Sequence, residues 1–183
     1  MNRLNETEIH QVLPYVFLGG DHRIRNKKYL DDLKIKSILN MIKWSPKNYF
    51  MKPYYKYFHI GWNDDWDQEI MDDLYNIAHI IHRNVKRKKN ILVHCQQGAS
   101  RSPTAIVAYM ILYLQMNVDY SYTLLNSKRC VVDRSNDHFK GKMIDFQIKI
   151  FNLYTKHLKL YTKHFDNKTI NLIQEYLWTF KKN

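Results

Sequence analysis

The stretch ILVHCQQGASRSPTA, residues 91–105, constrains the fold more than any other part of the chain. Its first four residues form an apolar-leaning run that predicts a short buried strand ending at Cys95. A loop of small and amide side chains follows, and Pro103 is suited to the first turn of the apolar helix that comes next. A buried strand joined to a helix by a tight loop is typical of α/β proteins with a largely parallel sheet.

The remaining patterns extend this alternation of strands and helices. Further strands are expected over residues 12–18, 35–42 and 54–62, and helices over residues 29–33 (a short turn), 70–85, 103–116 and 120–128. Asn117 is expected to cap the last of these helices. The sequence therefore predicts an α/β domain with a central, mostly parallel sheet flanked by helices.

The C-terminal part of the chain has a different pattern. Everything beyond Phe139 is expected to be helical, and the pentapeptide LYTKH occurs at residues 153–157 and again at 160–164, so that both copies fall on nearly the same helix face. A second apolar stripe comprises Ile170, Ile173, Leu177 and Phe180. We expect one domain over residues 1–154 and a helical extension over 155–183. The extension either packs on the domain or mediates a homodimer.

Composition sets the broad class of protein. The chain has 183 residues with 45% hydrophobic residues, enough for one packed domain, and its five glycines and four prolines argue against a disordered or fibrous chain. No run of about 18 uncharged apolar residues predicts a membrane span, and the polar N-terminus does not match a signal peptide. The two distant cysteines, Cys95 and Cys130, do not make a disulfide framework. These features suggest an intracellular, cytoplasmic protein, with a nuclear location as the alternative.

The formal net charge of +12 has two explanations. It could attract nucleic acid, an acidic membrane surface or phosphorylated partners. Abundant Lys, Asn, Ile and Tyr also follow from an AT-rich genome, such as that of a large DNA virus or a protist. The basic run over residues 83–89 is favoured at the negative end of the helix dipole, and this solvated helix end explains the run better than a binding patch does.

The loop after Cys95 has the composition of an anion cradle. A strand, a tight loop and a helix N-terminus can aim several backbone N–H groups at one oxyanion. Gly98 gives the loop room to turn, and Arg101 can offer a planar fork to two phosphate oxygens. The other loop positions are expected to contribute mainly their backbone N–H groups: Gln96, Gln97, Ala99 and Ser100.

The same surroundings favour a reactive cysteine. A helix N-terminus and a neighbouring arginine stabilise the thiolate of Cys95, which would then be a nucleophile beneath the phosphate site. Ser102 could donate a hydrogen bond to the sulfur when it later leaves. A buried structural thiol is the alternative, but it leaves the rest of the string HCQQGASRS unexplained.

The residues His94-Cys95, followed by five residues and then Arg101-Ser102, resemble the H-C-x5-R-[ST] signature of cysteine-dependent protein phosphatases. The whole loop is similar to that of dual-specificity phosphatases, especially the small atypical and MAP-kinase-phosphatase-like members. Residues 8–42 and 122–129 resemble the parts of that family on either side of the loop. This resemblance implies the protein tyrosine phosphatase-like α/β fold, with additional C-terminal helices here.

The resemblance also implies a two-step reaction without metal or cofactor. Cys95 would attack phosphorus to form a phosphocysteine, and an aspartic acid would protonate the leaving oxygen and then activate water. Spacing favours Asp64 as this acid, with Asp65 second, whereas Asp67 is expected to cap the next helix. His94 and Asn40 are expected to support the phosphate loop, although Asn40 could equally be a strand-end turn residue.

Some residues depart from the family pattern. Ser135 stands where the family often has a proline before Asn136, and residues 140–144 look like an insertion. Arg129 and Arg134 are expected to be surface arginines, although either could touch a second phosphate or an acidic substrate. Cys130 is expected to be a packed thiol, because nothing in its spacing supports a disulfide with Cys95.

The sequence is compatible with three functions. The first is a phosphatase acting on phosphotyrosine and phosphoserine/threonine in phosphorylated proteins. The second is an RNA 5′-phosphatase or triphosphatase, which the positive charge keeps in consideration. The third is a non-catalytic phosphoprotein-binding module, against which the presence of both Cys95 and Arg101 weighs heavily.

Overall fold

The structure, a computed structural model, describes residues 8–22, 24–44 and 54–161. Five strands form one sheet in the order β1-β2-β5-β3-β4. Their bounds are β1 His10–Leu13, β2 Val16–Gly19, β3 Ile35–Ile42, β4 Lys56–Trp62 and β5 Asn90–His94. Every neighbouring pair except β1 and β2 is parallel. The predicted central, mostly parallel sheet is therefore confirmed.

The single strand predicted over residues 12–18 is wrong. The chain forms an antiparallel hairpin instead, in which Leu13 pairs with Val16. Pro14 and Tyr15 make the turn, and Tyr15 adopts a left-handed backbone conformation with φ of 65°. A proline followed by such a residue reverses the chain, whereas the apolar pattern continues through the turn and hides it.

The register of the sheet brings three strand ends to one place. Gly19 at the end of β2 pairs with His94 at the end of β5, and Asn40 of β3 pairs with the same His94 from the other side. The loop that follows β5 therefore leaves the sheet between two neighbouring strands. In open parallel sheets, this carboxyl edge is where ligands bind.

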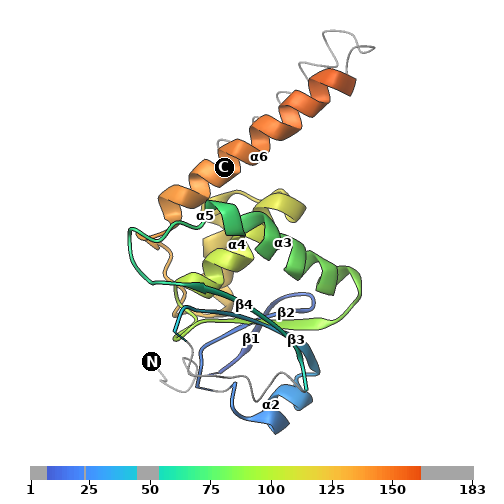
Figure 1. The fold of residues 1–183 in the computed structure, drawn as a ribbon, viewed down its shortest axis with the longest axis vertical. Helices are drawn as coiled ribbons and strands as arrows, with labels where there is room; N and C mark the ends of the chain where they lie inside the picture. Colours follow the sequence, from blue (N-terminus) through green and yellow to red (C-terminus); the bar gives the residue numbers. More distant parts are fainter. Residues whose placement is uncertain (1–7, 23, 45–53, 162–183) are drawn as a thin grey trace.

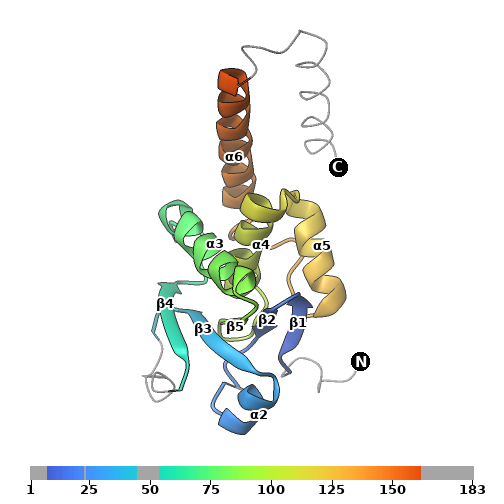
Figure 2. The ribbon, with the colours of Figure 1, turned by 90° about the vertical axis from the view of Figure 1, so that its right-hand side faces the viewer.

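Helices cover both faces of the sheet. In Figures 1 and 2, α3 (Met71–Lys86), α4 (Arg101–Leu114) and α5 (Val118–Lys128) lie above the sheet, and the short α2 (Lys27–Asp32) lies below it. Helix α4 is buried from Arg101 to Ile111 without interruption, as expected of a helix that is surrounded by protein. Asn117 caps α5 as predicted, because its side chain accepts a hydrogen bond from the amide of Tyr120.

The last described helix, α6 (Lys140–Tyr161), extends away from the domain in both views. Its first half nevertheless belongs to the core, because Met143, Phe146 and Ile150 are buried. The helix runs without a break through residue 154, where the sequence placed the end of the domain. Residues 162–164 of the second LYTKH copy and the apolar stripe beyond them lie outside the described residues.

Within the described part of the chain, every helix is too short or too polar to cross a membrane.

Candidate active site

Cys95 lies immediately after β5, at the N-terminal end of α4. Its side chain is buried, and two groups donate hydrogen bonds to its sulfur: the amide of Gly98 and the hydroxyl of Ser102, each 3.2 Å from Sγ. The two donors hold the sulfur at the centre of the loop, and Ser102 makes the hydrogen bond that the sequence predicted for it.

The carbonyl groups of residues 96–100 are all held by donors that lie outside this loop. The carbonyl of Gln96 accepts from the Asp21 amide (2.9 Å), and those of Gln97 and Gly98 accept from Nη2 (2.8 Å) and Nε (3.3 Å) of Arg129. The carbonyl of Ala99 accepts from the Asp133 amide (2.9 Å), and that of Ser100 accepts from the Thr104 amide (3.1 Å). A trans peptide directs its C=O and its N–H in opposite directions. Since these carbonyls are held away from the loop's centre, the amides of residues 97–101 are directed toward it, as the Gly98 bond to Cys95 demonstrates.

Gly98 is the residue that this loop requires. Its φ is +74°, in the left-handed region that side chains disfavour. A Cβ atom at this position would also lie 2.6 Å from the carbonyl oxygen of Gly19. Any larger residue would therefore push the loop away from β2 and disturb its ring of amides.

Arg101 begins α4 and is only 7% exposed. Its Nη1 donates to the carbonyl of Trp62 over 3.2 Å, and its Nη2 lies 3.3 Å from Oδ2 of Asp64. Its buried Nε has no hydrogen-bond partner among the described residues. The guanidinium is thus fixed by two contacts and keeps a donor available, as the predicted binding of a phosphate oxygen would require.

Asp64 is the carboxylate that the fold brings to the loop. Besides its ion pair with Arg101, its Oδ1 accepts a hydrogen bond from the hydroxyl of Ser100 over 2.8 Å. Within the described part of the chain, no hydrogen bond joins Asp65 or Asp67 to this loop. The expectation that Asp67 caps the next helix is wrong, because α3 starts after Ile70 and has no side-chain cap.

The segment that carries Asp64 is held from both sides. The indole of Trp62 donates to the carboxylate of Asp73 on α3 over 2.8 Å. From α6, Lys142 Nζ donates to the carbonyls of Trp66 (2.9 Å) and Gln68 (2.7 Å). Lys142 belongs to the apparent insertion, and no pattern in the sequence assigned it this role. The insertion therefore fixes the segment that carries Asp64.

Asn136 lies in the region where this chain departs from the family pattern, and it is fully buried. Its Nδ2 donates to Thr104 Oγ1 and to the hydroxyl oxygen of Tyr122, both over 2.7 Å. Its Oδ1 faces the hydroxyl of Ser100 at 3.1 Å. The structure thus connects Asp64 through Ser100 to a buried polar cluster, despite the missing proline before Asn136.

The expectation that Arg129 is a surface arginine is wrong, because its side chain is buried and only 1% exposed. Besides the two loop carbonyls, its Nη1 donates to the carbonyl of Glu8 over 2.6 Å. Five N–H donors in a rigid fork make arginine suited to holding several carbonyls at once. Its neighbour Cys130 is exposed, so the prediction of a packed thiol is wrong, whereas Arg134 is exposed as predicted.

Asn40 does not make the contact that the resemblance implied. Its Nδ2 donates to the hydroxyl of Tyr57 over 2.7 Å, and its Oδ1 accepts from the amide of Ile42 over 2.8 Å. These bonds fix the end of β3, beside His94, and reach the phosphate loop only through the sheet. The alternative, a residue that shapes the strand end, describes these contacts better.

His94 supports the loop from beneath as a neutral residue. It is fully buried, and this burial lowers the pKa of His94 to about 4, although the charge of Asp21 opposes the shift in part. An uncharged imidazole therefore packs under Cys95 at neutral pH. The residue belongs to the core of the site and carries no charge toward the substrate.

The chain matches the family model described as "Dual specificity phosphatase, catalytic domain" over residues 16–149. Human dual specificity protein phosphatase 16 is 29% identical over 142 residues, covering 78% of this chain and 21% of the relative. For human dual specificity protein phosphatase 6, the identity is 28% and the shares are 75% and 36%. The chain thus spans about a fifth to a third of the length of these relatives.

Solved structures agree with this assignment at the level of the fold. A mouse putative dual specificity phosphatase, complexed with zinc tungstate, superposes with a TM-score of 0.73 at 18% identity, covering 84% of this chain and 95% of that chain. Human DUSP28 gives 0.69 at 18% identity, with coverages of 78% and 94%. The chain therefore belongs to the dual-specificity phosphatase catalytic domain family, within the cysteine-dependent protein tyrosine phosphatases.

The neutral state of His94 predicts how stability depends on pH. Its pKa is near 6.5 when the chain is unfolded and about 4 when it is folded, so as the pH falls below 6.5 only the unfolded chain takes up this proton. Between pH 7.5 and 5, His94 should remove about 2 kcal/mol from the free energy of unfolding. Urea unfolding of the wild type and His94→Asn at both pH values measures the difference. An equal pH dependence in the two proteins would contradict this account.

Proposed function

We propose that this protein hydrolyses phosphate monoesters on tyrosine, serine and threonine side chains of phosphorylated proteins, through a phosphocysteine intermediate. The observations that carry the proposal are the outward-held carbonyls of residues 96–100, which direct the loop amides toward Cys95, and the Nε of Arg101, which has no hydrogen-bond partner among the described residues. Such a ring binds the three oxygens of a phosphoryl group while the sulfur stands below phosphorus. Membership of the phosphatase family supports the same chemistry.

In the first step, the thiolate of Cys95 attacks phosphorus and forms an S–P bond. The bond from phosphorus to the substrate oxygen breaks, and that oxygen takes a proton from Asp64. Arg101 and the loop amides stabilise the charge on the three transferred oxygens. The products of this step are the dephosphorylated side chain and a phosphocysteine.

In the second step, Asp64 acts as a carboxylate. It takes a proton from a water molecule, whose oxygen attacks phosphorus while the S–P bond breaks. The electron pair of that bond returns to Cys95, and the donors of Gly98 and Ser102 receive the thiolate. Inorganic phosphate leaves, and Asp64 is protonated again for the next cycle.

Ser100 and Asn136 provide a hydrogen-bond partner for both protonation states of Asp64. The hydroxyl of Ser100 has one proton and two acceptors within reach, Asp64 Oδ1 at 2.8 Å and Asn136 Oδ1 at 3.1 Å. When Asp64 is a carboxylate, Ser100 donates to it. When Asp64 is protonated, its own O–H can donate to Ser100, which then donates to Asn136 instead.

This change of acceptor by Ser100, which we call the Ser100 switch, requires the Oδ1 of Asn136 to face Ser100. That orientation follows from counting the protons in the cluster. Thr104 gives its hydroxyl proton to the carbonyl of Ser100 over 2.9 Å, so its Oγ1 otherwise only accepts. Tyr122 then donates to Thr104, and both oxygens are left to accept from Nδ2 of Asn136. The Oδ1 of Asn136 must therefore face Ser100.

Substitution of the nucleophile and of the acid tests the proposed function. Cys95→Ser should abolish hydrolysis of an aryl phosphate while phosphate binding persists. Asp64→Asn should slow turnover of a phosphopeptide by about 10²–10⁴-fold, because no other group protonates the leaving oxygen. Asp65→Asn is the matched control and should change turnover little. Phosphate release measures all three, and a larger loss in Asp65→Asn than in Asp64→Asn would show that the acid is misassigned.

The same assay decides between substrate classes. Release of phosphate from phosphotyrosine and phosphoserine peptides should exceed release from the 5′ end of a triphosphorylated RNA of equal concentration. Preference for the RNA would replace the protein phosphatase with the RNA 5′-phosphatase considered from the charge.

The switch at Ser100 predicts a dependence on the leaving group. Ser100→Ala should lower turnover of a phosphotyrosine peptide about tenfold, the effect of losing one hydrogen bond to the acid. An aryl phosphate with a strongly acidic phenol needs little protonation, so its turnover should hardly change. The variant removes no helix cap, because Ser100 makes no side-chain cap bond. Equal losses on both substrates would indicate a disturbed loop and contradict the role in positioning Asp64.

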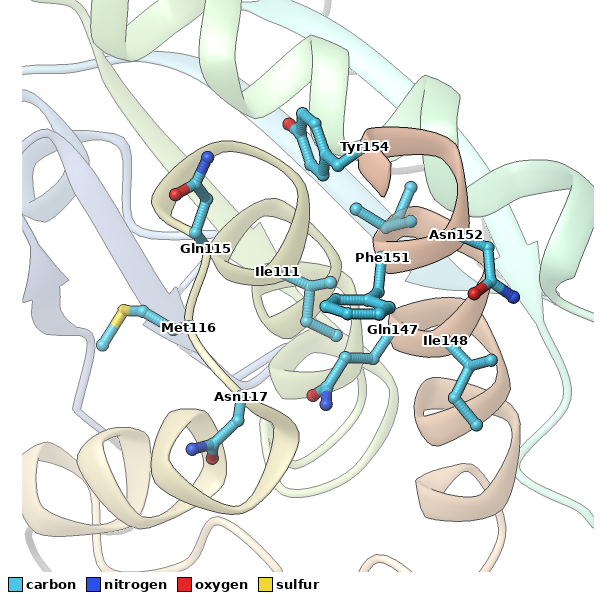
Figure 3. A pocket seen from close by; sticks show the side chains of 10 residues that line it. Ile111, Gln115, Met116, Asn117, Gln147, Ile148, Phe151, Asn152 and Tyr154 are labelled. Atoms are coloured by element: carbon cyan, nitrogen blue, oxygen red, sulfur yellow. The ribbon is translucent and has the colours of Figure 1, made fainter. Parts of the chain in front are cut away.

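We extend the proposal to assembly through α6. Ile144 and Ile148 project from this helix and are 42% and 44% exposed. Ile148 lines one side of an apolar groove of about 680 Å³ between α4, the connection from α4 to α5, and α6, in which Ile111 and Phe151 are prominent (Figure 3). A ridge next to a groove allows a two-fold homodimer in which each copy fills the other's groove.

Sedimentation equilibrium tests this assembly. The wild type should dimerise, and Ile144→Glu combined with Ile148→Glu should shift it to the monomer. Hydrolysis of an aryl phosphate should persist, because both side chains are exposed and neither contributes to the contacts described around Cys95. A wild type that stays monomeric at every concentration would contradict the homodimer.

The proposal also includes an intracellular location for this protein.

A further inference from the structure

A second hollow lies at the opposite end of the sheet from Cys95. It has a volume of about 480 Å³ and opens between the first residues of β3 and β4 and the last turns of α3. We call it the basic pocket; its lining comprises Lys36, Ser37, Lys56, Phe58, Ile80, Arg83, Asn84, Arg87 and Lys89. Five of these nine side chains are cationic, and none of the described residues that line it is acidic.

The helix dipole explains only part of this charge. Arg83, Arg87 and Lys89 come from the end of α3 and the turn after it, where cations are favoured by the negative pole of the helix. Lys36 and Lys56 come from two strands instead, and no helix end accounts for them. The sequence showed the helical run alone and favoured a solvated helix end. The fold adds two strand lysines to it and makes a concave site.

Among the described residues, no carboxylate lines the pocket, and the carboxylate of Asp31 acts on Lys36 from outside the lining. In the described part of the chain, none of the five cations lies within salt-bridge distance of a carboxylate. The floor is buried and already paired, because Ser37 donates to Asn84 Oδ1 over 2.7 Å and Asn84 donates to the carbonyl of Ile80 over 2.8 Å. Like charges gathered around a neutral, fixed floor repel one another, and a bound anion relieves that repulsion.

The wall of the pocket favours a peptide over a nucleic acid. Single-stranded nucleic acids are bound by exposed aromatic side chains on which bases stack, along a groove that follows the backbone. The lining here has a single aromatic residue, Phe58, and Lys56 Nζ lies over its ring at 5.2 Å. Arginine pairs bidentately with carboxylates as readily as with phosphates. The pocket is also a single hollow and not an extended groove of the kind that follows a nucleic-acid backbone.

We propose that the basic pocket binds an acidic segment of the phosphoprotein substrate, through Asp or Glu carboxylates or a second phosphate. The identity of this ligand rests on the proposed phosphatase function. Ser37 in the pocket and Asn40 beside His94 are three residues apart on β3, which places the pocket roughly 10 Å from the catalytic edge along the strand. A flexible linker on the substrate can therefore join the two sites and raise the local concentration of its phosphate.

A pair of peptides tests the docking. Each carries one phosphotyrosine, a twelve-residue Gly/Ser spacer and a tail of six glutamates or six glutamines. The KM of the glutamate peptide should be about tenfold lower at low salt, with the same kcat, and the difference should shrink in high salt. Arg83→Gln combined with Arg87→Gln should remove the difference. Lys86→Gln combined with Lys88→Gln changes the same charge on residues outside the pocket and should preserve it.

The outcomes separate this inference from the proposed function. If both variants hydrolyse an aryl phosphate like the wild type but the two peptides have equal KM values in all proteins, the pocket does not dock substrates and the phosphatase function stands. If the aryl phosphate is not hydrolysed, the function fails, and the fluorescence anisotropy of a labelled six-glutamate peptide tests the pocket alone. If the wild type binds the peptide and the double variant Arg83→Gln/Arg87→Gln does not, the result supports the pocket. Its absence, or tighter binding of a labelled single-stranded RNA, overturns the inference.

Discussion

The chemistry of this protein depends on how the carbonyl groups of one loop are held. Between β5 and α4, successive carbonyls are bonded to donors outside the loop, so that the amides converge on Cys95. A loop of this length has many conformations, and the inward one concentrates positive dipoles at one point. The external donors fix that conformation before any substrate binds, which is the condition for strong stabilisation of a phosphoryl group.

The parts that hold the loop come from distant places in the chain. Arg129 follows α5, the Asp21 amide follows β2, and Asn136 lies before α6. Lys142 of α6 holds the segment of Asp64 by two carbonyls. The helices after α4 therefore serve the site as well as the core, and the proposed domain boundary after residue 154 leaves every one of these residues inside the domain.

Much of the fold could be predicted because it depends on local patterns. The strand over residues 35–42 has the predicted bounds, and Asn117 caps α5, since burial and capping are encoded by neighbouring residues. The turn at Tyr15 was missed because its flanks are equally apolar. In the site, Gly98 and Arg101 could be recognised from the motif. The burial of Arg129 could not, because its partners lie more than thirty residues away in sequence.

A crystal structure of the wild-type protein with tungstate, an oxyanion shaped like phosphate, is the decisive test of whether the loop amides converge above Cys95. We predict that the metal centre of the oxyanion lies over Cys95 Sγ, with its oxygens receiving hydrogen bonds from the amides of residues 97–101 and from Nε of Arg101. Tungstate bound elsewhere, or a loop whose amides point away from it, would contradict the account.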